Sequence, residues 1–227
     1  MAFPGLAESV ADVRARIAAA VARGGHGQQV TIVAVTKTHG PDAASAAYEA
    51  GLHDVGENKV QEALKKMGRV EVPVRWHLIG HLQRNKVKSL ERFVMLHSLD
   101  SARLADAVCA FGVERGRAVD ALIELNLSGE SSKGGFTQSE LLPEAERLST
   151  LVGIRVRGVM TMASFTATET ELHRTFAEAR DARQALVEAG HPAEELSMGM
   201  SSDYEIAVEE GATMVRLGTT LFGARAK

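Results

Sequence analysis

The sequence feature that most constrains the fold is an alternation of short apolar, β-branched runs with stretches of helical periodicity. Alternation of this kind is typical of parallel βαβ units. Eight such units within 227 residues favour a closed (β/α)8 barrel of the TIM type over an open, doubly wound sheet. We therefore expect an α/β fold with a single barrel domain over residues 1–227. The strand-like runs are residues 30–37, 52–56, 74–80, 93–96, 119–127, 154–160, 195–198 and 213–217.

The composition narrows the classes of partner. The net charge of −3 gives no indication of nucleic-acid binding. The one cysteine, Cys109, cannot form an internal disulfide and suits a reducing cytosol. No stretch is apolar enough to cross a membrane, and the N-terminus lacks the pattern of a secretory signal. We expect a cytoplasmic protein that binds neither nucleic acid nor membranes.

Lys37 ends the first strand-like run, shortly before Gly40 and Pro41 break it. The reactive groups of such barrels lie at the C-terminal ends of their strands. Because side chains alternate along a strand, Lys37 shares a face with Val33 and Val35. Burial of that face would lower the pKa of the lysine and favour a free amine, which can attack a carbonyl. The alternative is an ordinary lysine whose ammonium group reaches solvent.

Two glycine-containing turns, residues 197–203 and 215–220, follow the seventh and eighth strand-like runs. The phosphate sites of barrel proteins usually form at this place. Gly218 allows close backbone approach, Ser201 and Thr219 supply hydroxyl groups, and backbone N–H groups add further donors. Each turn taken alone is equally well explained as an ordinary strand-to-helix connection.

Arg216 alternates with Met214 on one face of the last, otherwise apolar run. Arginine is rarely buried without a partner, so Arg216 either pairs with a carboxylate elsewhere in the barrel or donates to an acceptor in its mouth. A Schiff-base lysine, a phosphate cradle and a donor for a ring nitrogen are the groups that pyridoxal phosphate needs from a protein. The combination of Lys37, Arg216 and the two turns therefore predicts a pyridoxal phosphate site.

Other candidate motifs are weaker. Residues 129–135 are similar to a P-loop, but the lysine precedes the glycines, so the Walker pattern is not met and a polar loop is expected. His77 and His81 are four residues apart and have no evident third ligand, so we expect no metal site. Asn58, with Gln61 three residues later, has the pattern of a helix N-cap.

With these residues in view, the chain closely resembles the pyridoxal phosphate homeostasis proteins, which are barrel-shaped relatives of the alanine racemase N-terminal domain. The resemblance extends over nearly the whole chain, and its motifs are long and ordered. They comprise residues 33–37, 56–62, 76–86, 158–162, 196–203 and 214–219.

The resemblance implies roles for particular residues. It implies that Lys37 forms an internal aldimine with the cofactor and that Arg216 faces the pyridine nitrogen. The phosphate ligands that it implies are Ser201, Gly218 and Thr219. The residues that it implies around the ring, either as neighbours or one layer further out, are Asn58, Met160 and His81.

Members of this family are described as binding, storing or delivering the cofactor, without a settled catalytic reaction. The resemblance thus implies a cytoplasmic monomer, with apo forms of pyridoxal phosphate enzymes as recipients. Two alternatives remain: a pyridoxal phosphate-dependent amino-acid racemase, and a Schiff-base aldolase or lyase that uses Lys37 without cofactor.

Racemisation needs an acid or base on each face of the α-carbon, and Lys37 can serve one face. Alanine racemases take the second group, a tyrosine, from a further C-terminal domain across a dimer, whereas this sequence ends at Lys227. Its two tyrosines, Tyr48 and Tyr204, fall in helices after the first and seventh strands, and neither position suits that role. We therefore expect cofactor binding without racemisation at a useful rate.

Overall fold

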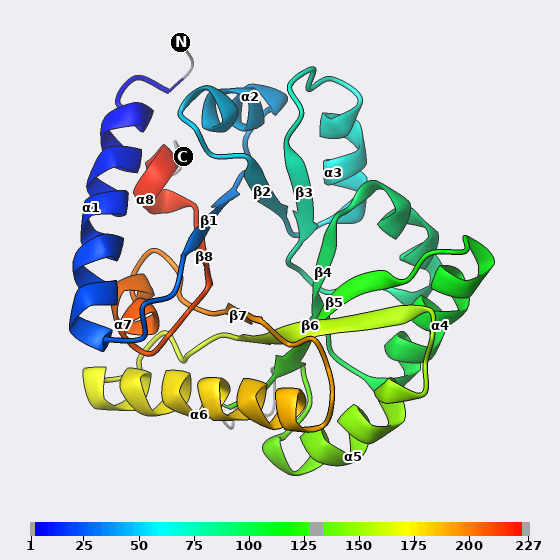
Figure 1. The fold of residues 1–227 in the computed structure, drawn as a ribbon. Coiled ribbons are helices and arrows are strands. Elements are labelled where there is room, and N and C mark those ends of the chain that lie inside the picture. Colours follow the sequence, from blue (N-terminus) through cyan, green and yellow to red (C-terminus); the bar gives the residue numbers. More distant parts are fainter. Residues whose placement is uncertain (1–2, 128–133, 224–227) are drawn as a thin grey trace.

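Eight parallel strands close into a single barrel in the order β1 to β8, which confirms the expected fold (Figure 1). The computed structural model describes residues 3–127 and 134–223. Every strand-like run of the sequence overlaps one of the strands. They are β1 (Thr31–Val35), β2 (Asp54–Glu57), β3 (Arg75–Leu78), β4 (Met95–Leu99), β5 (Val119–Leu125), β6 (Ile154–Thr161), β7 (Glu195–Ser197) and β8 (Met214–Leu217). Strand β4 lies mostly beyond the run at residues 93–96, and β2 and β6 each extend one residue beyond their runs.

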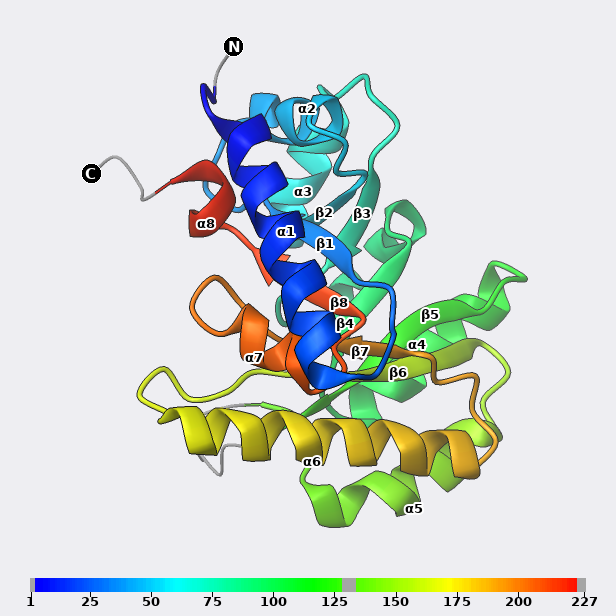
Figure 2. The same ribbon diagram turned by 60° about the vertical axis from the view of Figure 1, so that its left-hand side comes forward.

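Helices surround the barrel, and α1 runs along its outside beside β1 and rests on α7 (Figures 1 and 2). The start of the chain meets α8, where the rings of Phe3, His39 and Phe222 lie 5.2–5.6 Å apart. The helices are α1 (Leu6–Gly24), α2 (Pro41–Glu49), α3 (Val60–Met67), the 3-10 helix η1 (Arg84–Arg92), α4 (Ala102–Glu114), α5 (Gln138–Ser149), α6 (Glu169–Glu188), α7 (Tyr204–Glu209) and α8 (Thr219–Phe222).

The strands separate two apolar cores because their side chains alternate between the barrel interior and the helices. Outward-facing residues such as Ala34, Val55 and Leu78 belong to the large core beneath the helices. A small separate apolar cluster lies in the barrel interior, and each of its members comes from a different strand. These residues are Val33, Met95, Leu122, Met160 and Met214. Buried polar side chains from other strand positions share the interior with this cluster.

One local prediction was wrong. Asn58 does not cap a helix, because α3 begins at Val60 and Lys59, in the N-cap position, makes no side-chain capping bond. A Cβ atom at Gly80 would lie 2.5 Å from the Asn58 carbonyl oxygen, so the end of β3 packs directly on this segment. Tertiary packing, not helix capping, thus determines the place of Asn58. The expected polar loop at residues 129–135 falls mostly outside the described residues.

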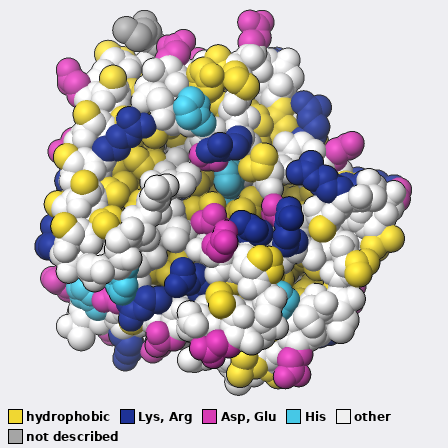
Figure 3. Space-filling model, in the orientation of Figure 1, with side chains coloured by type: hydrophobic (Ala, Val, Ile, Leu, Met, Phe, Trp, Pro, Cys, Tyr) yellow, Lys and Arg dark blue, Asp and Glu magenta, His cyan; other side chains and the backbone are white. Residues whose placement is uncertain are grey.

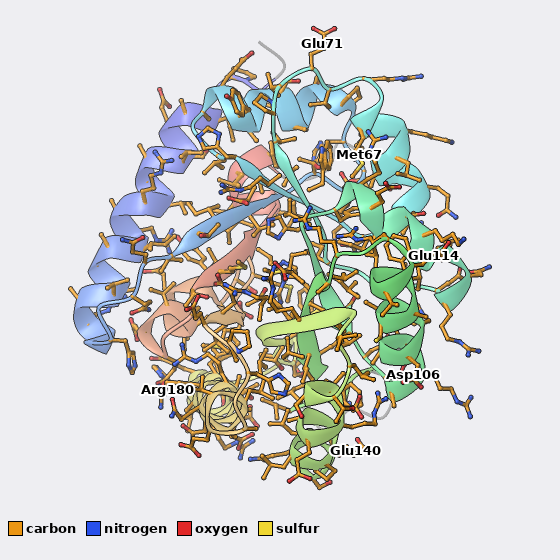
Figure 4. The ribbon with its side chains drawn as sticks, turned by 45° about the vertical axis from the view of Figure 1, so that its right-hand side comes forward. Met67, Glu71, Asp106, Glu114, Glu140 and Arg180 are labelled. Carbon is orange, nitrogen blue, oxygen red and sulfur yellow. The ribbon has the colours of Figure 1, made fainter. Side chains whose placement is uncertain are left out.

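The surface carries charges of both signs. On the face drawn in Figure 3, Lys and Arg side chains are interspersed with Asp and Glu. Four exposed acidic residues lie at the periphery in Figure 4: Glu71, Asp106, Glu114 and Glu140, of which Asp106 and Glu114 belong to α4. Within the described residues, no helix has the length and apolar character needed to cross a membrane.

A close contact between β6 and β7 generates a stability prediction. Gly158 has a φ of 149°, and a Cβ atom there would lie 1.7 Å from the carbonyl oxygen of Glu195. Gly158→Ala should therefore lower the free energy of unfolding by more than about 2 kcal/mol in urea denaturation. Gly68→Ala is the matched control, since Gly68 has a φ of −75° and ordinary contacts. Equal stability of the two variants would contradict this account.

Candidate cofactor-binding site

A cavity of about 660 Å³ opens at the C-terminal ends of the strands. We call it the mouth cavity. Seven of the eight site residues expected from the sequence line it: Lys37, Asn58, His81, Ser201, Arg216, Gly218 and Thr219. The eighth, Met160, lies below them in the interior apolar cluster, and Met162 lines the cavity instead. The barrel thus brings together side chains from opposite ends of the sequence.

Lys37 projects into the mouth cavity from a backbone that is held on both sides. It lies two residues beyond the end of β1 and is half-buried. On one side, the carbonyl oxygen of Thr36 accepts a hydrogen bond from Lys66 Nζ at 2.7 Å. On the other, the backbone N–H of Thr38, a residue with a φ of 70°, donates to Glu62 Oε1 at 2.7 Å. The backbone position of Lys37 is therefore fixed by neighbouring charged side chains.

Those side chains belong to a buried ion network that the sequence analysis did not find. Lys66 is 5% exposed and donates to Glu57 Oε1 at 2.6 Å, which also accepts from the Thr36 hydroxyl at 2.5 Å. Burial raises the pKa of Glu57, and its bonds to Lys66 and Thr36 oppose that shift. A signal existed, because Lys66 shares the inward face of α3 with Ala63 and Met67.

The two glycine-containing turns meet at one wall of the mouth cavity. Ser201 Oγ accepts long hydrogen bonds from the backbone N–H groups of Gly218 and Thr220, at 3.4 and 3.3 Å. Ser201, Gly218 and Thr219 all line the cavity. Hydroxyl groups and backbone N–H groups on one wall are the donors that a phosphate group accepts from.

Arg216 is the most buried charged group at the mouth cavity. Its guanidinium donates to the Ser197 carbonyl oxygen and hydroxyl at 2.8 and 2.6 Å, and to the Thr161 carbonyl oxygen at 2.9 Å. Within the described chain it forms no ion pair, so the alternative of a salt bridge is not found. Burial lowers the pKa of Arg216 to about 10, and the charges of Asp203 and Glu124 oppose that shift.

Arg216 therefore stays protonated near neutral pH, and some of its N–H groups are not used by Ser197 and Thr161. A guanidinium has five N–H groups, and within the described part of the chain Ser197 and Thr161 use three of them. Since the residue also lines the mouth cavity, the remaining two can donate to a ligand acceptor there.

Glu124 is a second cavity residue that the sequence analysis missed. It lies on β5, four strands from β1 in either direction round the barrel, so it approaches the cavity from the side opposite Lys37. The residue is largely buried although it lines the cavity. Burial raises the pKa of Glu124 to about 7, helped by the negative charge of Asp100 and opposed by Arg216 and His81. An acidic residue near the end of a strongly apolar strand was the available signal.

The histidines have separate surroundings. His81 Nδ1 lies 2.6 Å from Asp100 Oδ2 at the rim of the mouth cavity. Both ring nitrogens of His77 are engaged inside the barrel, with Asp54 and His97. His77 and His81 therefore do not converge, and the described residues contain no cluster suited to a metal ion.

Neither tyrosine lines the mouth cavity. Tyr204 is buried, with the Arg16 guanidinium 5.5 Å from its ring centroid. The Tyr48 ring packs against His53 at 4.8 Å. A tyrosine base opposite Lys37, as in the alanine racemases, is therefore not supplied by the described part of this chain.

The barrel and its mouth cavity define a class of protein built on the alanine racemase N-terminal barrel. The pattern of the family "Alanine racemase, N-terminal domain" matches residues 9–226. Two relatives are each named pyridoxal phosphate homeostasis protein. The one from Pseudomonas aeruginosa is 40% identical, over 97% of this chain and 96% of its own length. The one from Aquifex aeolicus is 39% identical, over 96% and 97%. The chain belongs to the family of pyridoxal phosphate homeostasis proteins, as its sequence motifs predicted.

Solved structures agree with this placement. PipY of Synechococcus elongatus without PLP is 37% identical, with a TM-score of 0.86 over 96% of this chain and all of that chain. A structure of PipY with PLP bound is 36% identical, with a TM-score of 0.85 and the same coverage. Alanine racemase of Corynebacterium glutamicum, at 15% identity, has a TM-score of 0.75 over 99% of this chain and 62% of that chain. This last likeness shows the fold alone.

The raised pKa of Glu124 generates a prediction about pH and stability. A folded-state pKa of about 7, above the ordinary value of 4.5, means that the folded protein holds a proton that the unfolded chain releases. Stability should therefore fall as the pH rises from about 4.5 to about 7. Urea denaturation at pH 5 and pH 8 measures this loss of free energy of unfolding. In Glu124→Gln the loss should be about 1–3 kcal/mol smaller than in wild type.

The control for this prediction is Glu71→Gln, at an exposed residue labelled in Figure 4. It should leave the pH dependence unchanged. If Glu124→Gln and wild type lose the same stability between pH 5 and pH 8, Glu124 is ionised throughout and the account is wrong.

Proposed function

We propose that this chain binds pyridoxal 5'-phosphate in the mouth cavity and acts in the homeostasis of this cofactor. Lys37 holds the cofactor as an aldimine, and binding is the basis of its storage or delivery. Support comes from relatives named for this role and from the similar protein PipY, whose structure has been solved with PLP bound. The whole chain acts as one cofactor-binding domain.

The observation that carries the proposal is that three kinds of group face one cavity. Lys37 supplies an amine for the aldehyde, Arg216 supplies free N–H groups for the ring nitrogen, and the wall of Ser201, Gly218 and Thr219 supplies donors for the phosphate. The cavity volume of about 660 Å³ lies within the range of small-molecule sites. Asn58 and His81 line the same cavity and are proposed neighbours of the ring, with Met160 closing it from below.

The aldimine is tested by trapping. Borohydride reduction of the loaded protein, followed by digestion and mass spectrometry, should place a phosphopyridoxyl group on Lys37. Lys37→Ala should carry no such group and should lose the visible absorbance of the bound cofactor. Lys59→Ala, at an exposed lysine, is the matched control and should keep both. An adduct on another lysine would refute the assignment, and a colourless protein that takes up no cofactor would favour the aldolase or lyase alternative.

Glu124 is the specific observation that favours a second candidate function, an amino-acid racemase using pyridoxal phosphate. Racemisation needs a proton acceptor on one face of the substrate α-carbon and a donor on the other. Lys37 and Glu124 approach the mouth cavity from opposite strands of the barrel. A carboxyl group whose pKa is about 7 can both accept and donate a proton near neutral pH.

Incubation of the loaded protein with L-alanine in deuterated water separates the two functions. A cofactor carrier should form no D-alanine at an enzymatic turnover of about 1 per second or faster. D-alanine formed at that rate, lost in Glu124→Gln and kept in the control Tyr204→Phe, would establish the racemase. Deuterium exchange at the α-carbon without inversion would fit a site in which Lys37 acts alone.

We further propose a cytoplasmic monomer that passes the cofactor to apo forms of pyridoxal phosphate enzymes. The proposal follows the family's described role and the mixed-charge surface in Figure 3. Light scattering on the purified protein should give the mass of one chain, 24.3 kDa.

A further inference from the structure

A line of buried polar side chains crosses the barrel interior and ends at Arg216. Arg216 donates to Ser197 Oγ at 2.6 Å, and Ser197 Oγ lies 2.9 Å from His97 Nδ1. His97 Nε2 lies 2.9 Å from His77 Nδ1, and His77 Nε2 lies 2.9 Å from Asp54 Oδ1. The line therefore joins five strands, from β8 through β7, β4 and β3 to β2. We call it the interior chain.

The interior chain is shielded from water along its length. Ser197 and His97 are fully buried, and His77, Arg216 and Asp54 are at most 6% exposed. Polar groups buried in this way destabilise a protein unless each is hydrogen-bonded. Because water cannot substitute for a missing partner, the position of each proton in the chain is constrained.

The direction of the first bond follows from the chemistry of arginine. A guanidinium only donates, so Ser197 Oγ must accept from Arg216. The Ser197 hydroxyl keeps its own proton, and His97 Nδ1 is its other partner. The complete arrangement has Ser197 donating to an unprotonated His97 Nδ1.

The direction of the last bond follows from Asp54. Burial by itself raises the pKa of Asp54, but hydrogen bonds and charges from Arg75 and His77 outweigh it and lower the pKa to about 2. Asp54 is therefore an ionised acceptor at neutral pH. His77 must donate to it from Nε2.

The remaining question is which of the two histidines donates in the hydrogen bond between them. Burial lowers the pKa of His97 well below its ordinary value, so this ring is neutral and has a single N–H. With that proton on Nε2, His97 donates to His77 Nδ1 and every group has a partner. With the proton on Nδ1, His77 would have to be an imidazolium, and the Ser197 hydroxyl proton would have no acceptor among the described residues. The first arrangement satisfies all groups.

We propose that Ser197, His97, His77 and Asp54 form a proton-ordered chain that positions Arg216 at the mouth cavity. The chain fixes Ser197 Oγ as an acceptor and thereby holds the guanidinium with its two free N–H groups toward the cavity. These four side chains are positioning residues for Arg216, since none of them lines the mouth cavity. The consequence for cofactor binding rests on the function proposed above.

The common direction of these hydrogen bonds also stabilises the buried positive charge of Arg216. Every bond runs in the same sense, from the arginine cation at one end to the aspartate anion at the other. Hydrogen bonds aligned head to tail polarise one another and strengthen the chain. At the other end, the Asp54 carboxylate also accepts a hydrogen bond from Arg75 Nε, at 2.7 Å to Oδ1. Removal of one link should therefore weaken the hold on Arg216 at a distance.

Nitrogen-15 NMR of histidine in the cofactor-free protein tests the proton order directly. His77 and His97 should each give the pattern of a ring with its single proton on Nε2. Single substitutions His77→Gln and His97→Gln assign the signals. A proton on Nδ1 of either ring would overturn the proposal.

A second experiment removes one link and reads the effect at Arg216. Ser197→Ala deletes the hydroxyl, and Ser98→Ala is the matched control, since Ser98 is a buried strand serine that donates to the Gly80 carbonyl oxygen instead. In the cofactor-free protein, the side-chain N–H signals of Arg216 should exchange faster with water in Ser197→Ala than in wild type or Ser98→Ala. Equal exchange in all three proteins would refute the positioning role.

Cofactor selectivity supplies the functional readout. The ligands are pyridoxal phosphate and an analogue in which a C–H group replaces the ring nitrogen. Ser197→Ala should reduce the preference for pyridoxal phosphate by about 5–10-fold, the loss of one oriented bond from a charged donor. An unchanged ratio would overturn the link to the ring nitrogen. A wild-type protein that binds neither ligand would refute the proposed function. The NMR measurements, made without cofactor, would still test the proton order of the interior chain and its hold on Arg216.

Discussion

The burial of the Arg216 guanidinium is the constraint on which the arrangement of this barrel depends. A cation removed from water must be surrounded by acceptors, and here Ser197 and the Thr161 carbonyl supply them from β7 and β6. Those acceptors are supported in turn by buried histidines on β4 and β3. One charged residue on the last strand therefore organises polar groups around much of the barrel.

The backbone around Lys37, just beyond the first strand, is held by hydrogen bonds from side chains of α3. Lys66 and Glu62 of α3 bond the backbone on either side of it, and Glu57 of β2 anchors Lys66. The lysine that faces the mouth cavity thus stands on a backbone with little freedom. A rigid support of this kind suits the proposed role of Lys37, in which the amine meets the cofactor aldehyde in a defined geometry.

The mouth cavity divides into two halves of different chemistry. The half formed by β1, β7 and β8 carries Lys37, Arg216 and the wall of Ser201, Gly218 and Thr219, which hold the cofactor under the function proposed above. The other half carries Asp100 and Glu124, and burial raises the pKa of Glu124 to about 7. The second candidate function, proton transfer on a substrate, rests on this second half.

The barrel, the eight strands and seven of the residues that line the mouth cavity could be predicted from the sequence, because they follow from local periodicity and from the rule that strand ends meet. Lys37, Ser201 and Arg216 are visible as exceptions within local patterns. Three features become visible only in the folded barrel: the partners of Arg216, the support of Lys37 by Lys66 and the position of Glu124 opposite β1. These depend on residues as far apart as His97 and Ser197 becoming neighbours when the sheet closes, and a capping pattern at Asn58 cannot reveal that β3 will pack against it.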